Sequence, residues 1–358
     1  MTSNGTDTGS GTSQSKPYSI WMAESVMARG QGLASPDGTS GQWLRIGFFQ
    51  TALLEILSAN GLDNMVEQRE RVLDYLECGA RKAASLVLDA KRNVTFSLDR
   101  LSLGRGLSFQ YERSKDELYK NALDALRESI DLQPRNHFVV DEASTKPTTQ
   151  YVRYYSRLIS YGSTVFTNRV GSLFTVMTLL KTALESPTMS KDSAKWEDLK
   201  SKFQYLIKKI VHCRDSKSKF QYLIKKIVHC RDSKSNGWWQ LMCSPDLPGN
   251  YIESSCSSIF VFVILRGSRL GFLESLLSDD NIEKAACEAY DAIARKFVVK
   301  RDDGALGFNG TVDVCSLNSP ASYDYYLSRP IQQDSVLGTS AFILASLERD
   351  RYTGAALD

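Results

Sequence analysis

The sequence predicts an all-α protein, and two observations carry that prediction. Apolar residues recur at helical spacing through most of the 358-residue chain, whereas the alternation typical of strands is rare. Connectors rich in Gly, Pro and Asp, such as 244–251 and 300–310, separate the helical stretches. The expected order is therefore helix, loop, helix throughout, and long loops on a rigid helical scaffold commonly carry function.

The clearest helical pattern covers 47–60, where Phe48, Phe49, Leu53 and Leu57 form one apolar stripe, with a glycine next as a C-cap. A second covers 116–132 and is stopped by a proline. The same spacing predicts further helices over 66–88, 171–185, 196–213, 254–265, 281–297 and 336–348. Residues 1–16 are almost entirely polar and small, so we expect a disordered tail before a single domain over 17–352.

A tandem duplication interrupts this pattern, because 201–217 and 218–234 are identical. Seventeen residues advance a helix by about 4.7 turns, so one continuous helix would rotate the second apolar stripe by about 100°. Both copies therefore cannot face one core from a single helix. We expect a break at 214–218, with one copy docked on the core and the other extruded.

The formal charge of +3 depends on this duplication. One copy carries five Lys or Arg and one Asp, so removing it leaves +3 − 4 = −1. The sequence therefore predicts no nucleic-acid partner. It also predicts no membrane partner, since no apolar run approaches the ~20 residues that cross a bilayer.

The start of the chain lacks a signal-peptide pattern, and the seven cysteines are widely spaced. Cysteines spaced in this way are typical of buried free thiols in a reducing compartment, so we expect a cytoplasmic protein. The sequence makes no prediction of oligomeric state.

Few classes of catalytic chemistry are compatible with the residue inventory. There are three histidines, and two of them are copies of one residue, which disfavours a metal site. Motifs for nucleotide binding and for acyl transfer are missing from the sequence. What remains is carboxylates and aromatics in loops, which suit acid–base chemistry on carbohydrates. The candidate carboxylates are Asp99, Asp246, Glu253, Asp302, Asp303 and Asp324. Judged by composition alone, a carboxylate of this kind is more often a helix cap or a turn former than a catalytic group.

Motifs in the C-terminal half are specific in combination. They are Gly237-Trp238-Trp239-Gln240, Pro248-Gly249-Asn250-Tyr251-Ile252-Glu253-Ser254-Ser255, Arg266-Gly267 with Arg269-Leu270-Gly271, and the run 322–331 followed by Asp334 and Gly338. With thinner matches at 17–23, 98–101 and 133–135, the chain resembles the unsaturated rhamnogalacturonyl hydrolases, glycoside hydrolase family 105 of the six-hairpin glycosidases. The resemblance covers most of residues 17–350.

This resemblance implies an (α/α)6 barrel of six helical hairpins that binds its substrate at one end. Relatives remove unsaturated uronic acid residues from pectin-derived oligosaccharides. An aspartic acid protonates the C4=C5 double bond, water adds at C5, and the resulting hemiketal opens. The implied partner is an oligosaccharide or another small-molecule substrate, and no cofactor or metal is implied.

The sequence departs from the family after Arg135. Relatives continue there into a Trp-Leu-Asp-Gly helix start that supplies the principal catalytic aspartate, whereas this chain has unrelated residues over 136–150. We therefore expect a barrel that lacks about one hairpin. Three explanations are compatible with the gap: a gene model with a lost exon, a non-catalytic relative, or a barrel recruited to other chemistry such as secondary-metabolite biosynthesis.

The resemblance also assigns candidate site residues. Asp99 stands where relatives keep a second active-site aspartate, and it is the surviving catalytic candidate. Arg169 matches the arginine of a family motif and is expected to hold the uronate carboxylate. Trp43, Trp239 and Tyr325 are the aromatic candidates for contact with sugar rings.

Overall fold

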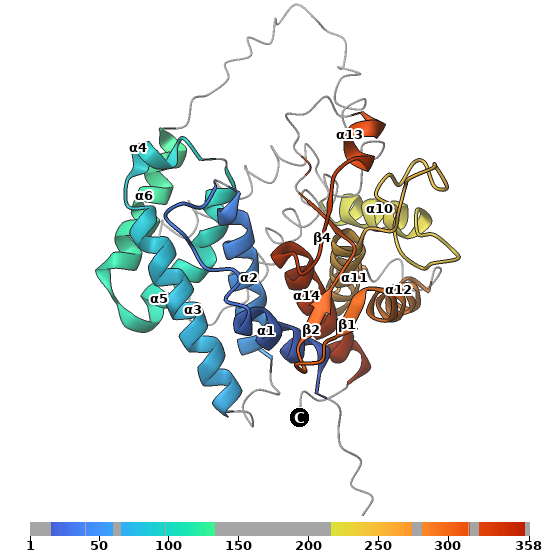
Figure 1. Cartoon of the computed structure of the whole chain (residues 1–358), viewed down its shortest axis with the longest axis horizontal. Helices are drawn as coiled ribbons and strands as arrows, with labels where there is room; N and C mark the ends of the chain where they lie inside the picture. The colour runs from blue at the N-terminus through green and yellow to red at the C-terminus, as the bar shows by residue number, and fades with distance from the viewer. Residues whose placement is uncertain are drawn as a thin grey trace, which may run out of the picture.

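A computed structural model gives the arrangement of the chain (Figure 1). The structure describes residues 16–39, 41–59, 66–96, 98–132, 216–273, 281–313, 315 and 322–354. Its elements are α1 (Tyr18–Ala28), α2 (Gln42–Leu57), α3 (Val66–Leu86), α4 (Ala90–Asn93), the 3-10 helix η2 (Leu98–Leu103), α5 (Gly104–Ser114), α6 (Glu117–Asp131), α10 (Ser216–His229), α11 (Ser254–Arg269), α12 (Ile282–Phe297), β1 (Val298–Lys300), β2 (Leu306–Phe308), β3 (Thr311–Val312), α13 (Tyr323–Leu327), β4 (Ile331–Gln332) and α14 (Val336–Thr353). The predicted all-α class is confirmed.

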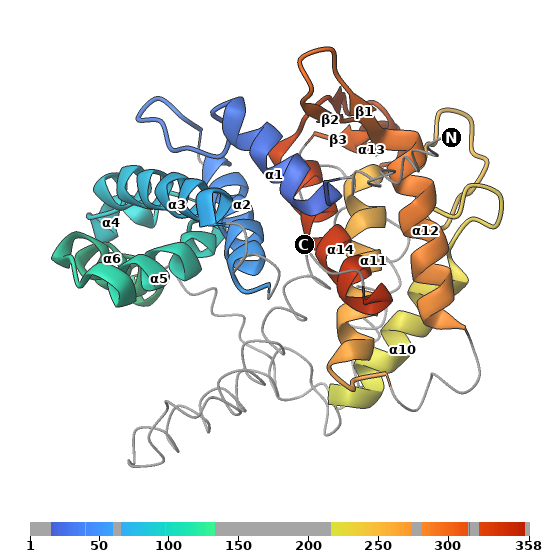
Figure 2. The same cartoon turned by 90° about the horizontal axis from the view of Figure 1, so that it is seen from below.

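Burial separates inner helices from outer ones. Side chains of α2, α11 and α14 are buried around most of the helix circumference, whereas α3, α6 and α12 bury residues along one face only. A helix buried on all sides lies inside a core, and an amphipathic helix covers it. Figure 2 shows the helices in two groups, α2 to α6 and α10 to α14, with α1 beside both.

The three inner helices run in the same direction. At one end, the Ser254 hydroxyl at the start of α11 lies 2.9 Å from the Thr311 hydroxyl. Gly338, near the start of α14, packs so closely against the same hydroxyl that a Cβ at this position would clash with it. At the other end, Glu55 near the end of α2 pairs with Arg266 near the end of α11. Parallel inner helices are what the predicted barrel requires, and loops that precede them gather at one end.

The strands form two short antiparallel pairs, β1 with β2 and β3 with β4. The β3–β4 pair fixes the chain just before α14. There, Asp334 accepts a hydrogen bond from the Phe308 backbone N–H at 2.8 Å and pairs with Arg301. The motif residues Asp334 and Gly338 are thus explained by packing.

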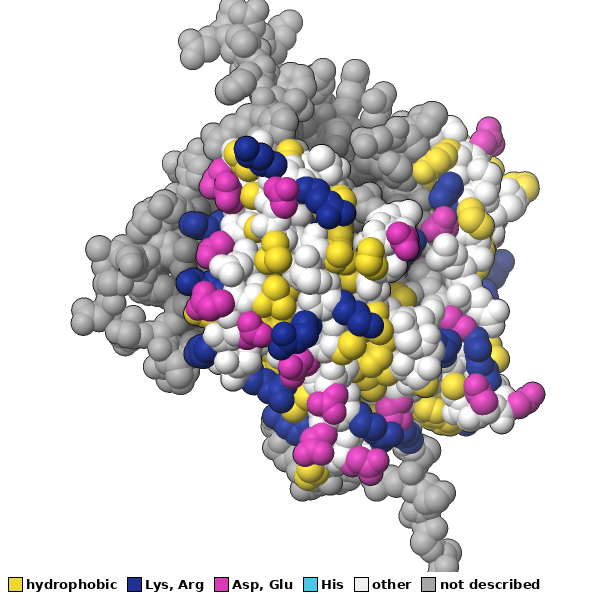
Figure 3. Space-filling view, turned by 60° about the vertical axis from the view of Figure 1, so that its left-hand side comes forward, with side chains coloured by type: hydrophobic (Ala, Val, Ile, Leu, Met, Phe, Trp, Pro, Cys, Tyr) yellow, Lys and Arg dark blue, Asp and Glu magenta, His cyan; other side chains and the backbone are white. Residues whose placement is uncertain are grey.

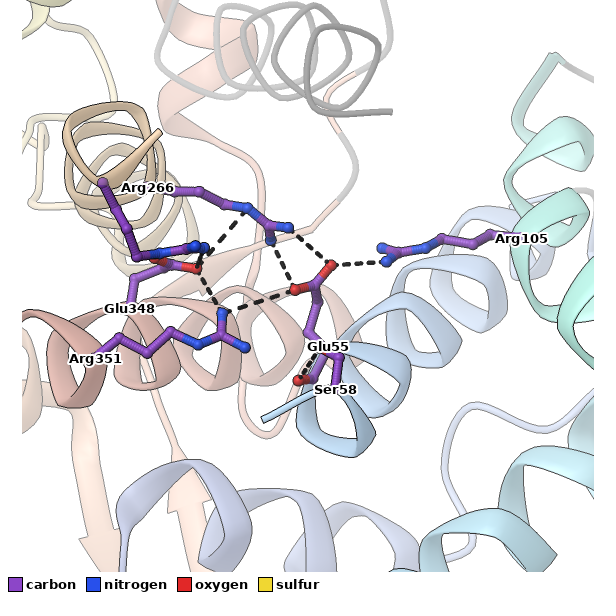
Figure 4. A network of polar contacts seen from close by, with 7 residues as sticks. Glu55, Ser58, Arg105, Arg266, Glu348 and Arg351 are labelled. Atoms are coloured by element: carbon purple, nitrogen blue, oxygen red, sulfur yellow. Dashed lines mark hydrogen bonds and ion pairs between the residues drawn. The ribbon is translucent and has the colours of Figure 1, made fainter. Parts of the chain in front are cut away.

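A buried ion network joins the ends of the inner helices (Figure 4). Arg266 pairs with both Glu55 oxygens, at 2.8 and 3.2 Å, and Arg105 approaches the same carboxylate at 2.7 Å. Arg269 and Arg351 pair with the buried carboxylate of Glu348. Burial opposes ionisation of Glu55, but Arg266 and Arg105 outweigh it, so the pKa of the Glu55 carboxyl is lowered.

The second copy of the duplication is packed on the core. Helix α10 begins at Ser216, inside the predicted break, and its Ile224 and Ile227 are fully buried. The indole Nε1 of Trp238 donates to the Ile227 carbonyl at 2.7 Å. Residues 201–215 lie outside the described residues, so extrusion of the first copy stays a prediction.

The remaining expectations have mixed outcomes. The helices predicted over 66–88, 116–132 and 281–297 are confirmed almost to their ends, and those predicted over 254–265 and 336–348 extend further, as α11 and α14. The helix predicted over 47–60 begins earlier, as α2, and ends at Leu57 with Ser58 as its C-cap, so the predicted end at a glycine cap is wrong. The helices expected over 171–185 and 196–213, and the gap after Arg135, fall outside the described residues. The tail expected over 1–16 also falls outside the described residues, except for Lys16.

The six described cysteines are free, as expected, but the expectation that they are buried is wrong for Cys78 and Cys243, which are exposed. Both lie at solvent-facing positions where nothing requires an apolar side chain. None of the described helices has the length and hydropathy to span a bilayer. On the face shown in Figure 3, basic and acidic side chains are intermixed, with apolar side chains between them.

Removal of one repeat tests the docking of α10. Deleting 201–217 or 218–234 yields the same polypeptide, because the copies are identical. We expect an unchanged or higher free energy of unfolding in urea, since the remaining copy supplies the residues equivalent to Ile224 and Ile227. A loss of more than about 2 kcal/mol would show that both copies are packed.

Asp350 on α14 predicts a pH dependence of stability. Burial raises the pKa of its carboxyl to about 6 from 3.8, and Arg349, Ser19 and Arg351 offset only part of that rise. The folded state therefore binds the Asp350 proton more tightly than the unfolded state does. The contribution of this proton to the free energy of unfolding is lost as the pH rises from about 4 to about 6. Asp350→Asn should raise the free energy of unfolding at pH 7 by about 1–2 kcal/mol and leave it nearly unchanged at pH 4. An equal effect at both pH values would contradict this assignment.

Candidate functional site

Four segments meet at the end of the molecule where the inner helices begin. They are the start of α2, the 3-10 helix η2, the loop 237–253, and the segments around β3, α13 and β4. The loop joins β3 through Glu253, which accepts from the Val312 backbone N–H at 3.1 Å. The start of α2 reaches the same region through Arg45, whose Nη2 lies 3.8 Å from Asp313 Oδ1.

Asp99 lies in η2, directly beside the start of α2. The Ser102 hydroxyl is 2.7 Å from the Asp99 carbonyl oxygen and 2.7 Å from the Trp43 carbonyl oxygen. Gly47 permits this close approach, because a Cβ there would lie 2.3 Å from Ser102 Oγ. Asp99 is partly buried.

The aromatic candidates occupy three different surroundings. Trp43 is 2% exposed and packs against Phe96, with ring centroids 5.5 Å apart. Trp239 is partly buried at the edge of the main core and forms an isolated backbone bridge with Ile252. Tyr325 is partly buried in a separate cluster with Leu241, Val312, Cys315 and Tyr326. Arg169, the candidate for the carboxylate, lies outside the described residues.

These placements bring Asp99, Trp43 and Tyr325 to one end of the molecule. Asp99 and Trp43 are joined through Ser102, and Trp43 is two residues from Arg45, which faces Asp313. Tyr325 is connected to the same region through Arg329, whose guanidinium carbon lies 5.7 Å from the Tyr325 ring centroid and whose Nη2 donates to Asp313. Trp239 instead packs, partly buried, against the main core cluster.

The loop 237–253 is shaped by its own motif residues. The Asn250 side chain accepts from the Leu241 N–H at 3.1 Å and donates to the Ser244 carbonyl at 2.8 Å, which closes the turn. Gly249 adopts a φ of 86°, a conformation that favours glycine. The conformation of this loop therefore follows from local hydrogen bonds.

The other carboxylates named from the sequence are caps and turn formers. Glu253 is fully buried at the start of α11, where it accepts from the Cys256 N–H at 2.5 Å. Burial raises the pKa of its carboxyl, and hydrogen bonds from Cys256, Val312 and Ser255 oppose the rise. Asp246 has a φ of 63°, and Asp303 accepts from the Ala305 N–H at 2.9 Å in a turn.

The structure adds residues that sequence reasoning missed, namely Arg45, Asp313 and Gln332. Arg329 belongs to the quoted run 322–331, but its role was not predicted. Tyr325 and Arg329 are four residues apart, and this spacing was the one sequence signal that could have predicted their contact. In the described part of the chain, no three His, Cys, Asp or Glu side chains are grouped to hold a metal ion.

Comparisons with known sequences agree with this geometry. Residues 196–353 match the family model described as Glycosyl Hydrolase Family 88. Protein Atu3128 of Agrobacterium fabrum and the 24.9 kDa protein in picA locus of Rhizobium radiobacter are each 28% identical over 117 residues, 31% of this chain and 50% of each relative. The chain thus spans about half the length of the curated relatives it matches.

Solved structures share the fold over nearly the whole chain. A family 105 glycoside hydrolase from C. acetobutylicum superposes with a TM-score of 0.63 at 21% identity, covering 94% of this chain and 100% of that one. A possible family 105 member from Klebsiella pneumoniae gives a TM-score of 0.53 at 14% identity, covering 93% and 92%. The expected resemblance and the (α/α)6 barrel fold are thereby confirmed.

Proposed function

Since the chain is related to glycoside hydrolase families 88 and 105 and has their six-hairpin fold, we propose that it is a glycosidase that removes unsaturated uronyl residues from acidic oligosaccharides. The observation that carries this proposal is the place of Asp99. It lies beside the starts of the inner helices, in the segment that the family resemblance assigns to an active-site aspartate. The rhamnogalacturonan origin of the oligosaccharide is part of the proposal.

In the proposed reaction, the Asp99 carboxyl donates its proton to C4 of the C4=C5 double bond. Water adds its oxygen at C5 and returns a proton to the carboxylate. The resulting hemiketal at C5 opens: the bond from C5 to the ring oxygen breaks, C5 becomes a ketone, and the proton of the C5 hydroxyl passes to the former ring oxygen. C1 is then a hemiacetal, which collapses to an aldehyde as its bond to the leaving sugar's oxygen breaks and that oxygen takes the hydroxyl proton. A positioned carboxyl contributes about 10²–10⁴-fold to such a proton transfer.

Two features of the site support this role. Asp99 is held by η2 and not by a flexible loop tip, because Ser102 joins η2 to the Trp43 carbonyl. At the same end of the molecule, Arg45, Arg329 and Tyr325 offer cationic and aromatic groups of the kind that bind acidic sugars. Because the family's principal aspartate has no counterpart at 136–150, we expect slow turnover.

Asp99→Asn tests the proposal. The assay follows loss of the absorbance of the conjugated double bond in an unsaturated galacturonyl-rhamnose disaccharide. We expect the substitution to lower turnover by about 100-fold or more, because the amide has no acidic proton to donate. The melting temperature should stay within a few degrees of that of the unsubstituted chain.

Asp302→Asn is the matched control, since Asp302 is an exposed residue in the turn between β1 and β2. It should leave turnover unchanged. Binding of the disaccharide without turnover by the unsubstituted chain would contradict a hydrolase, and an active Asp99→Asn variant would remove Asp99 from the mechanism.

A further inference from the structure

Two arginines from opposite ends of the chain converge on one carboxylate. Arg45 comes from the first turn of α2, while Asp313 follows β3 and Arg329 follows α13. Arg329 Nη2 donates to Asp313 Oδ2 at 3.0 Å, and Arg45 Nη2 lies 3.8 Å from Oδ1. The side chains of Arg45, Asp313 and Arg329 are 34%, 22% and 30% exposed, so a ligand can reach all three.

The carboxylate is already satisfied without Arg45. Gln332 Nε2 donates to Asp313 Oδ1 at 2.9 Å, and Arg329 occupies Oδ2. The distance to Arg45 is too long for a hydrogen bond. Among the residues that the structure describes, Asp313 is also the sole acidic partner of Arg45. The guanidinium of Arg45 therefore keeps its donors available.

Arg329 likewise has an unused donor. Its one hydrogen bond to a described residue goes from Nη2 to Asp313. Its Nε has no partner among the described residues but is buried, so the donor that a ligand can reach on this partly exposed side chain is Nη1. The Tyr325 ring lies 5.7 Å from the guanidinium carbon, which limits the orientations of the group. Two positive charges thus face one negative charge, and the unfilled donors belong to planar forks that match a carboxylate.

We propose that Arg45 and Arg329 form a clamp for the carboxylate of an acidic sugar, with Asp313 between them. This inference rests on the proposed function for its ligand class. The clamp and the catalytic candidate lie at the same end of the molecule, because Arg45 is in the first turn of α2 and Ser102 of η2 bonds the carbonyl of Trp43 in that turn. A bound carboxylate would join the N-terminal and C-terminal segments and thereby stabilise the fold.

Ligand-dependent melting tests the clamp independently of hydrolysis. The probes are sodium galacturonate and, at equal ionic strength, galactose with sodium chloride. We expect galacturonate to raise the melting temperature of the full chain by about 1–2 °C at tens of millimolar, and galactose to have no such effect. Arg45→Gln and Arg329→Gln should each abolish the difference between the two sugars. Arg113→Gln, an exposed arginine of α5 paired at 3.7 Å with Glu77, should keep it.

The outcomes separate the two proposals. A galacturonate effect that depends on Arg45 and Arg329, in a chain that does not hydrolyse the unsaturated disaccharide, supports the clamp and rejects the glycosidase. Hydrolysis together with equal stabilisation by the two sugars, or a galacturonate effect that survives both substitutions, overturns the clamp and leaves the glycosidase standing. A chain that neither discriminates the sugars nor hydrolyses the disaccharide overturns both.

Discussion

The carboxylate of Glu55 must stay paired inside the protein, and much of the architecture depends on this constraint. An unpaired charge at that depth would be strongly destabilising. The partners come from far away along the chain: Arg266 is 211 residues distant, yet it takes both carboxylate oxygens. Arg266, Arg269 and Arg351 also lie in the last turns of α11 and α14, where positive side chains compensate the negative ends of the helix dipoles. The network therefore aligns the ends of the inner helices.

The alignment of the helix ends by this network also determines which residues meet at the opposite end of the helices. Because α2 and α11 are fixed together near Glu55, their starts are brought to the same end of the molecule as η2 and β3. The start of α2 holds Arg45 opposite Asp313, which follows β3, and η2 holds Asp99 beside the Trp43 carbonyl. A structural network and a candidate site thus lie at opposite ends of the same helices, so the loops at the second end are not needed for the network.

Local sequence signals predicted much of the fold. Helical periodicity identified α3, α6 and α12 because each has one apolar face, and Asp116 caps α6 where the pattern begins. The ends of α2, α11 and α14 were harder to place, since helices buried on all sides have no polar face to mark their length. The site was predictable only in part: the resemblance located Asp99, but Arg45 and Asp313 lie in sequence contexts that carry no motif, and their proximity follows from tertiary packing alone. The roles of Glu253 and Asp246 as a helix cap and a turn former were within reach of the sequence, because local hydrogen bonds and turn geometry decide them.

A double-mutant cycle on Glu55 and Arg266 tests most directly whether a buried ion pair joins the two halves of the chain. The free energy of unfolding would be measured in urea for the unsubstituted chain, Glu55→Gln, Arg266→Gln and the double variant. Removal of one partner leaves the other charge buried, so each single substitution should be costly and the double variant should lose much less than their sum. The account predicts a coupling energy of about 2 kcal/mol or more. Additive losses, with a coupling energy within about 0.5 kcal/mol of zero, would contradict it.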